Sequence, residues 1–172
     1  LMGEDKIAEP HITSPQGVSL VSVVIPAYNG ENSLVSCLES IENQDYAGEY
    51  EVIVVDNAST DNTAQIARDW GAKVVYEGKH SPACARQKGA EVAKGKIIAF
   101  IDADTRAPTH WLSTIVWRFL CEPEIVALSG PYAYCDAGKF SKVTSYVGNF
   151  FSIITDQLFR KVFKKGTAVW GC

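Results

Sequence analysis

The chain has 172 residues, of which 47% are hydrophobic and 10% aromatic, so it can bury roughly two thirds of its unfolded surface in one core. Its formal net charge of -4 argues against a nucleic-acid partner, because binding to a phosphate backbone needs clustered lysine and arginine. Its longest apolar run, 18–27, is far shorter than the roughly 20 residues that span a bilayer.

The first 19 residues carry early acidic side chains and no apolar segment, so we expect a flexible leader over 1–19 rather than a secretion signal. The folded domain is then expected over 20–172. The chain also has an odd number of cysteines, which are far apart and form no C-x-x-C pair. This number and spacing argue against a zinc site and against a disulfide framework. They favour a protein of a reducing compartment, and we expect it to be cytoplasmic.

The first predicted element is a buried strand, VSVVIP over 21–26, whose β-branched run ends at a proline. A helix should follow, because Leu34, Leu38 and Ile41 recur at helical spacing. The segment EVIVVD over 51–56 predicts a second strand. This order is the beginning of a β-α-β pattern.

The alternation then continues along the chain. TAQIARDWGA predicts a helix with Asp61 as its N-cap and Gly71 as its C-cap. KVVYE predicts a third strand, PACARQKGAEVAKG a helix that ends at Gly95, and KIIAFID a fourth strand. Alternating strands and helices imply an α/β fold, with a mainly parallel central sheet and helices on both faces.

Polar residues follow three of these strands, and ligands of open α/β sheets bind beyond the carboxyl ends of the strands. Tyr28 and Asn29 follow the first strand, Asp56 ends the second, and Asp102 and Asp104 follow the fourth. Two nearby carboxylates repel each other unless a cation intervenes, and Mg²⁺ or Mn²⁺ is commonly held by such a pair together with a diphosphate. The alternative is that the two aspartates only flank a turn and the helix expected near Pro108.

Other nucleotide-binding signatures do not fit. The first turn, PAYNGENS, holds one glycine and cannot be the G-x-G-x-x-G loop of a dinucleotide-binding site. A nucleotidyltransferase should carry a glycine-rich, basic loop at the same place, and this loop is neither glycine-rich nor basic.

Taken together, VSVVIPAYN, VIVVDNASTDNT and ARQKGAEVAKGKIIAFIDADT closely resemble the donor-binding half of family 2 glycosyltransferases, which have the Rossmann-like GT-A fold. The resemblance implies a UDP- or GDP-sugar donor, Mn²⁺ or Mg²⁺ as cofactor, and transfer with inversion to a saccharide or lipid-linked acceptor. A cell-envelope polysaccharide would be a product of this kind. The alternatives are a non-catalytic nucleotide-sugar-binding module and a nucleotidyltransferase.

The resemblance also implies roles for single residues. Asp102 would contact the ribose or the metal, and Asp104 would bind the metal that bridges the diphosphate. Arg86 would lie near the ribose or the phosphates, although Gln87 stands where the family commonly has asparagine. Asp56 would hydrogen-bond the edge of the base, and the base pocket would be lined by Pro26, Ala27 and Tyr28.

Each of these roles has a structural alternative. Arg86 could be an exposed helix arginine, Asp56 a cap of the following loop, and Tyr28 a residue of the core. The nucleophilic hydroxyl of an acceptor also needs a general base. In the family this base is an aspartate well past D-x-D, and we expect it beyond Cys172, because neither Asp136 nor Asp156 stands in the expected context.

The last predicted helix lies within 140–165, where apolar residues form a helical stripe and cations follow at its end. One interpretation is a peripheral contact with the inner face of a membrane, which would suit a lipid-linked acceptor. The other is an amphipathic helix that packs against protein.

Overall fold

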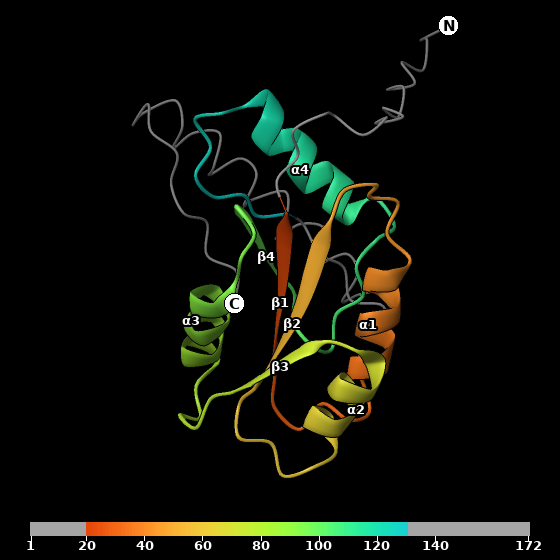
Figure 1. The fold of residues 1–172 in the computed structure, drawn as a ribbon, viewed down its shortest axis with the longest axis vertical. Helices are drawn as coiled ribbons and strands as arrows, with labels where there is room; N and C mark the ends of the chain where they lie inside the picture. Colours follow the sequence, from red (N-terminus) through yellow and green to blue (C-terminus); the bar gives the residue numbers. More distant parts are fainter. Residues whose placement is uncertain (1–19, 131–172) are drawn as a thin grey trace, which may run out of the picture. The chain divides into compact units, whose positions relative to one another are not determined.

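The computed structural model describes residues 20–130. Contacts divide the chain after Trp117 into two units. The first, described over 20–117, contains a four-stranded sheet and the helices packed on it (Figure 1). The second is described over 118–130, where Arg118 Nη1 pairs with Glu122 Oε1 at 2.8 Å.

All four strands of the sheet are parallel, and their order is β3-β2-β1-β4. The strands are β1 (Val21–Ala27), β2 (Tyr50–Asp56), β3 (Lys73–Tyr76) and β4 (Ile97–Phe100). The helices that alternate with them are α1 (Leu34–Glu42), α2 (Thr63–Trp70), α3 (Pro82–Val92) and α4 (Trp111–Cys121). The predicted α/β fold with a parallel sheet is confirmed.

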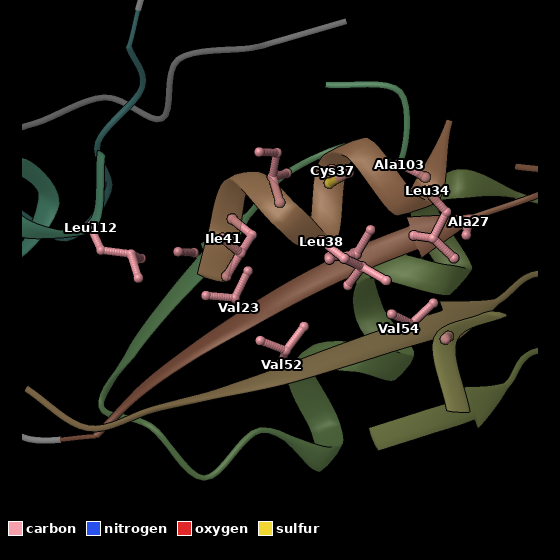
Figure 2. Close-up of a cluster of buried hydrophobic side chains, with 14 of the residues drawn as sticks. Val23, Ala27, Leu34, Cys37, Leu38, Ile41, Val52, Val54, Ala103 and Leu112 are labelled. Atoms are coloured by element: carbon pink, nitrogen blue, oxygen red, sulfur yellow. The ribbon is translucent and has the colours of Figure 1, made fainter. Parts of the chain in front are cut away.

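Both faces of the sheet are covered, which explains why β1 and β2 are apolar almost throughout. On one face, Val23 of β1 packs in a cluster with Leu38 and Ile41 of α1 (Figure 2). On the other face, Val24 packs in a second cluster with Ala85 of α3. Helices α1 and α2 therefore cover one face and α3 the other (Figure 1).

Two predicted helix ends need correction. Asn62, not Asp61, holds the N-cap position of α2, although the Asp61 carboxylate accepts the Thr63 N–H at 3.0 Å. Helix α3 ends at Val92 rather than at Gly95. Beyond Val92, the Gly95 N–H donates to the buried Ser22 hydroxyl of β1 at 2.8 Å, which draws the chain out of the helix. The predicted C-cap of α2 is confirmed.

Several expectations fall outside the described residues. These are the leader over 1–19, the apolar stripe and its cations within 140–165, and the aspartates 136 and 156. Within 20–130, no helix is long and apolar enough to cross a membrane.

The contact of α3 with the sheet gives a stability prediction. A Cβ on Gly89 would lie 2.3 Å from Val24 Cγ1 and 3.1 Å from Val55 Cγ2. Alanine normally stabilises a helix relative to glycine. Here the added methyl group would overpack the core, so we expect Gly89→Ala to lower the free energy of unfolding by about 1–3 kcal/mol instead of raising it. Urea denaturation measures this. The exposed Gln87→Ala change in the same helix should stay within about 0.5 kcal/mol of wild type, and a Gly89→Ala variant as stable as wild type would contradict the packing.

Candidate functional site

A cavity of about 470 Å³ opens at the carboxyl edge of the sheet, within the first unit. Its volume lies in the range of pockets that bind small molecules. The loops after β1 and β4 and the first turns of α3 supply most of its walls. The lining residues are Pro26, Ala27, Tyr28, Asn29, Gly30, Ser33, Asn57, Pro82, Arg86, Asp102, Ala103 and Asp104.

All the residues predicted from the sequence line this cavity except Asp56. Asp56 is buried at the end of β2, and its Oδ1 accepts the Ser59 N–H at 3.1 Å. This is the loop-capping contact that sequence reasoning held as the alternative for Asp56. A contact of Asp56 with a nucleobase stays a prediction.

Tyr28 is not a core residue, because 48% of it is exposed. Its ring meets the imidazole of His80 edge to face, with ring centroids 4.0 Å apart and an interplanar angle of 76°. The ring therefore lies at the rim of the cavity, where an aromatic face can stack on a planar ligand.

Sequence reasoning missed part of the lining, including Asn57, Pro82 and Ser33. Asn57 directly follows a strand end, and Pro82 opens the first turn of α3, so their positions in the chain were the available signal. Ser33 carries no comparable signal, because its place in the lining depends on the path of the β1–α1 loop, which the sequence does not reveal.

Charge gathers at one side of the cavity. Arg86 Nη2 on α3 lies 2.6 Å from Asp102 Oδ1, in an ion pair whose side chains are 38% and 55% exposed. Arg86 is therefore not an unpartnered surface arginine. Burial, together with the negative charges of Asp104 and Asp102, raises the pKa of the Cys37 thiol to about 12, so the thiol beside the two aspartates stays protonated.

The two carboxylates at the cavity wall suit a divalent metal whose other ligands are phosphates and waters. Within 20–130, no group of three or more histidine, cysteine, aspartate or glutamate side chains could hold a metal ion. Mg²⁺ and similar ions are, however, usually bound by one or two carboxylates, with phosphates and waters as the other ligands. Asp102 and Asp104 at the cavity wall fit that pattern and do not form an all-protein cage.

The loops after β1 and β2 are joined by a set of hydrogen bonds that we call the loop clamp, between residues 29–31 and 59–63. Gly30 N–H donates to the buried Thr63 hydroxyl at 2.8 Å. Glu31 N–H donates to Asp61 Oδ2 at 3.1 Å, and Glu31 Oε2 accepts the Asn62 N–H at 3.1 Å.

Asn29 adds to the clamp from an unusual backbone conformation. Its φ of 47° is left-handed, a region that asparagine tolerates better than most residues. Asn29 N–H donates to Ser59 Oγ at 3.0 Å, and Asn29 Oδ1 accepts the Thr60 N–H at 2.8 Å. The clamp thus fixes the segment that carries Tyr28, Asn29 and Gly30 into the cavity wall.

A third loop is fastened through Asn57. The Asn57 side-chain amide donates to the backbone carbonyl oxygens of Glu77 and Lys79, at 3.2 and 2.5 Å. These contacts hold the β3–α3 connection, which presents His80 to Tyr28. The loops after β1, β2 and β3 are therefore connected to one another.

Comparison with known proteins shows which family the chain resembles. The family model for "Glycosyl transferase family 2" matches residues 22–171. The glycosyltransferase GlyG of Streptococcus pneumoniae is 32% identical over 146 residues, which are 81% of this chain and 45% of GlyG. The chain thus spans less than half the length of this relative.

Solved structures agree in fold. S. aureus TarS in complex with UDP is 29% identical, with a TM-score of 0.61 over 69% of this chain and 37% of that one. The mannosyltransferase PcManGT of Pyrobaculum calidifontis, in complex with GDP-Man and Mn²⁺, is 28% identical, with a TM-score of 0.58 over 72% of this chain and 40% of that one.

The loop clamp predicts a pH dependence. Burial alone would raise the pKa of the Asp61 carboxyl, but hydrogen bonds from Thr63 and from the Glu31 N–H outweigh burial and lower it. Asp61 then adds stability above its unfolded-state pKa of about 3.9, and this contribution is lost as the pH falls through the lower folded-state pKa.

We expect Asp61→Asn to lower stability at neutral pH and to flatten the fall in stability below about pH 4. Urea unfolding at a series of pH values measures both effects. Asp69→Asn makes the same chemical change on the exposed face of α2 and serves as the control. An acid limb unchanged by Asp61→Asn would mean that the clamp does not depend on this carboxylate.

Proposed function

Because the chain belongs to glycosyl transferase family 2, we propose that it forms the donor-binding part of an inverting, metal-dependent glycosyltransferase. The donor is a nucleotide-diphosphate sugar with UDP or GDP as the nucleotide, and the acceptor is a saccharide or a lipid-linked saccharide, as in the assembly of a cell-envelope polysaccharide. The observation that carries the proposal is the convergence of Tyr28, Arg86, Asp102 and Asp104 on one cavity.

The charges of the cavity suit a diphosphate. A guanidinium binds phosphate oxygens in a bidentate manner, and Arg86 is the one arginine or lysine in the lining that the described residues form. Asp104, with Asp102, would hold Mn²⁺ or Mg²⁺ beside the diphosphate. When bound, such an ion offsets the negative charge that develops on the departing diphosphate as the glycosidic bond breaks.

The nucleoside would occupy the other side of the cavity. Pro26 and Ala27 end β1 and line the wall, and the half-exposed ring of Tyr28 offers a stacking surface at the rim. Asp56 pairs with Ala27 in the sheet. It would hydrogen-bond the edge of the base through the carboxylate oxygen that does not accept the Ser59 N–H. These assignments are part of the proposal.

Transfer with inversion also needs a base that removes the proton of the acceptor hydroxyl. We assign none of the residues 20–130 to that role. The choice of acceptor, a cytoplasmic location and a peripheral membrane contact through 140–165 also belong to the proposal.

A nucleotidyltransferase is the weaker alternative, because such an enzyme would hold phosphate on free N–H groups of the first loop. Here the N–H groups of Asn29, Gly30 and Glu31 donate to the side chains of the loop clamp. A non-catalytic nucleotide-sugar-binding module would use the same cavity. Assays of sugar transfer to saccharide and lipid-linked acceptors by the full-length parent protein, which would include the expected base, separate that module from an enzyme.

The metal role of Asp104 is tested by Asp104→Asn, which keeps the shape of the side chain and removes its charge. Calorimetry should show that Mn²⁺ enhances UDP or GDP binding to the wild-type chain. We expect the variant to lose at least about tenfold of that enhancement, the usual order for a lost contact to a charged group. Its unfolding midpoint should stay close to that of wild type, since Asp104 is exposed. Asp69→Asn is the matched control, and equal Mn²⁺ enhancement in wild type and Asp104→Asn would exclude Asp104 as a ligand.

A further inference from the structure

The ion pair between Arg86 and Asp102 joins two side chains that the proposed function assigns to opposite ligands. Arg86 would bind the diphosphate, and Asp102 would help to hold the metal, yet the two lie 2.6 Å apart. We propose that this is an exchangeable ion pair, through which the cavity selects a divalent metal and a diphosphate bound together over either ligand alone. The inference rests on the proposed function for the identity of the two ligands.

The charges of the cavity wall support the exchange. Within residues 20–130, the lining contains one guanidinium, on Arg86, and two carboxylates, on Asp102 and Asp104. While the pair is closed, Arg86 offsets the charge of Asp102. Among the described residues, the Asp104 side chain makes one hydrogen bond, which is long, accepting from the Thr105 hydroxyl at 3.5 Å. A metal ion that arrives alone therefore finds one unpaired carboxylate and must compete with Arg86 for the other.

A diphosphate that arrives alone meets the opposite obstacle. It can attract Arg86, but doing so separates the pair and exposes the phosphates to both carboxylates, which repel them. When metal and diphosphate arrive together, Arg86 moves to the phosphates, Asp102 is released to the metal, and the metal shields the remaining repulsion. Each ligand thus removes the obstacle to the other.

The pair is suited to open without rearrangement of the backbone. Its side chains are 38% and 55% exposed, and ion pairs in contact with water contribute little net stability. The backbones on either side are held in place: Ala85, next to Arg86, is buried against the sheet, and the Asp102 carbonyl accepts the Thr105 N–H at 2.9 Å. Rotation of the two side chains is sufficient for the exchange.

The test uses Arg86→Gln in the 172-residue chain and two titrations. With Mn²⁺ alone, measured by electron paramagnetic resonance, the variant should bind roughly two- to fivefold more tightly than wild type, because Asp102 no longer has a competing partner. With UDP in the presence of Mn²⁺, measured by calorimetry, the same variant should bind about tenfold more weakly, because the phosphate contact is lost. The two effects have opposite signs.

Two controls isolate the ion pair. Arg68→Gln, on the exposed side of α2, makes the same charge change outside the cavity and should alter neither titration. In an Asp102→Asn background, Arg86→Gln should no longer tighten Mn²⁺ binding, since the competing carboxylate is gone. If Arg86→Gln tightened Mn²⁺ binding equally in both backgrounds, the cause would be general repulsion between Arg86 and the metal. That result would overturn the exchange.

The exchange is also overturned if Arg86→Gln leaves Mn²⁺ affinity unchanged or weakens it, whatever happens to UDP. A failure of the proposed function looks different. In that case the wild-type chain would bind neither UDP nor GDP with Mn²⁺, while the Mn²⁺ titrations of the variants would still decide whether Arg86 competes for Asp102.

Discussion

The position of β1 is the constraint on which the rest of the site depends. This strand is paired in parallel with β2 on one edge and with β4 on the other, from Val21 onward in both ladders. Parallel pairing brings the carboxyl ends of the three strands to one edge of the sheet. Tyr28, Asn57 and Asp102 are far apart in the chain, and they share a cavity because of this pairing.

Around that edge, charge and hydrogen bonding are divided between two regions. The side near α3 and β4 carries the ionised groups, with Arg86 against Asp102 and Asp104 beside them. Among the described lining residues, those of the β1–α1 loop, Asn29, Gly30 and Ser33, carry no charge. The charged groups of the loop clamp, Glu31 and Asp61, accept backbone N–H groups and do not line the cavity. Among the described lining residues, charge is therefore confined to the side near α3 and β4.

Periodicity predicted the fold, and strand-end chemistry predicted Tyr28, Asp102 and Asp104 in the lining, since both are local properties of the chain. Pro26, Ala27 and Arg86 were expected only from the family resemblance. The strand over 21–26 and the C-cap at Gly71 could be read from a few neighbouring residues. The end of α3 could not, because it depends on hydrogen bonds of Lys94 and Gly95 to Ser22, more than 70 residues away. The pair of Arg86 with Asp102 was hidden for the same reason, since only the folded sheet brings α3 beside the end of β4.

The loop clamp also determines whether the cavity loops lose their backbone conformational entropy on folding or on ligand binding. Loops that are free in solution must surrender backbone entropy of about 1–2 kcal/mol per residue when a ligand orders them. Here residues 29–31 and 59–63 are tied by contacts within the protein, so this loss occurs during folding. A ligand that enters the cavity then meets loop backbone that is already ordered, so it does not have to order these two loops itself.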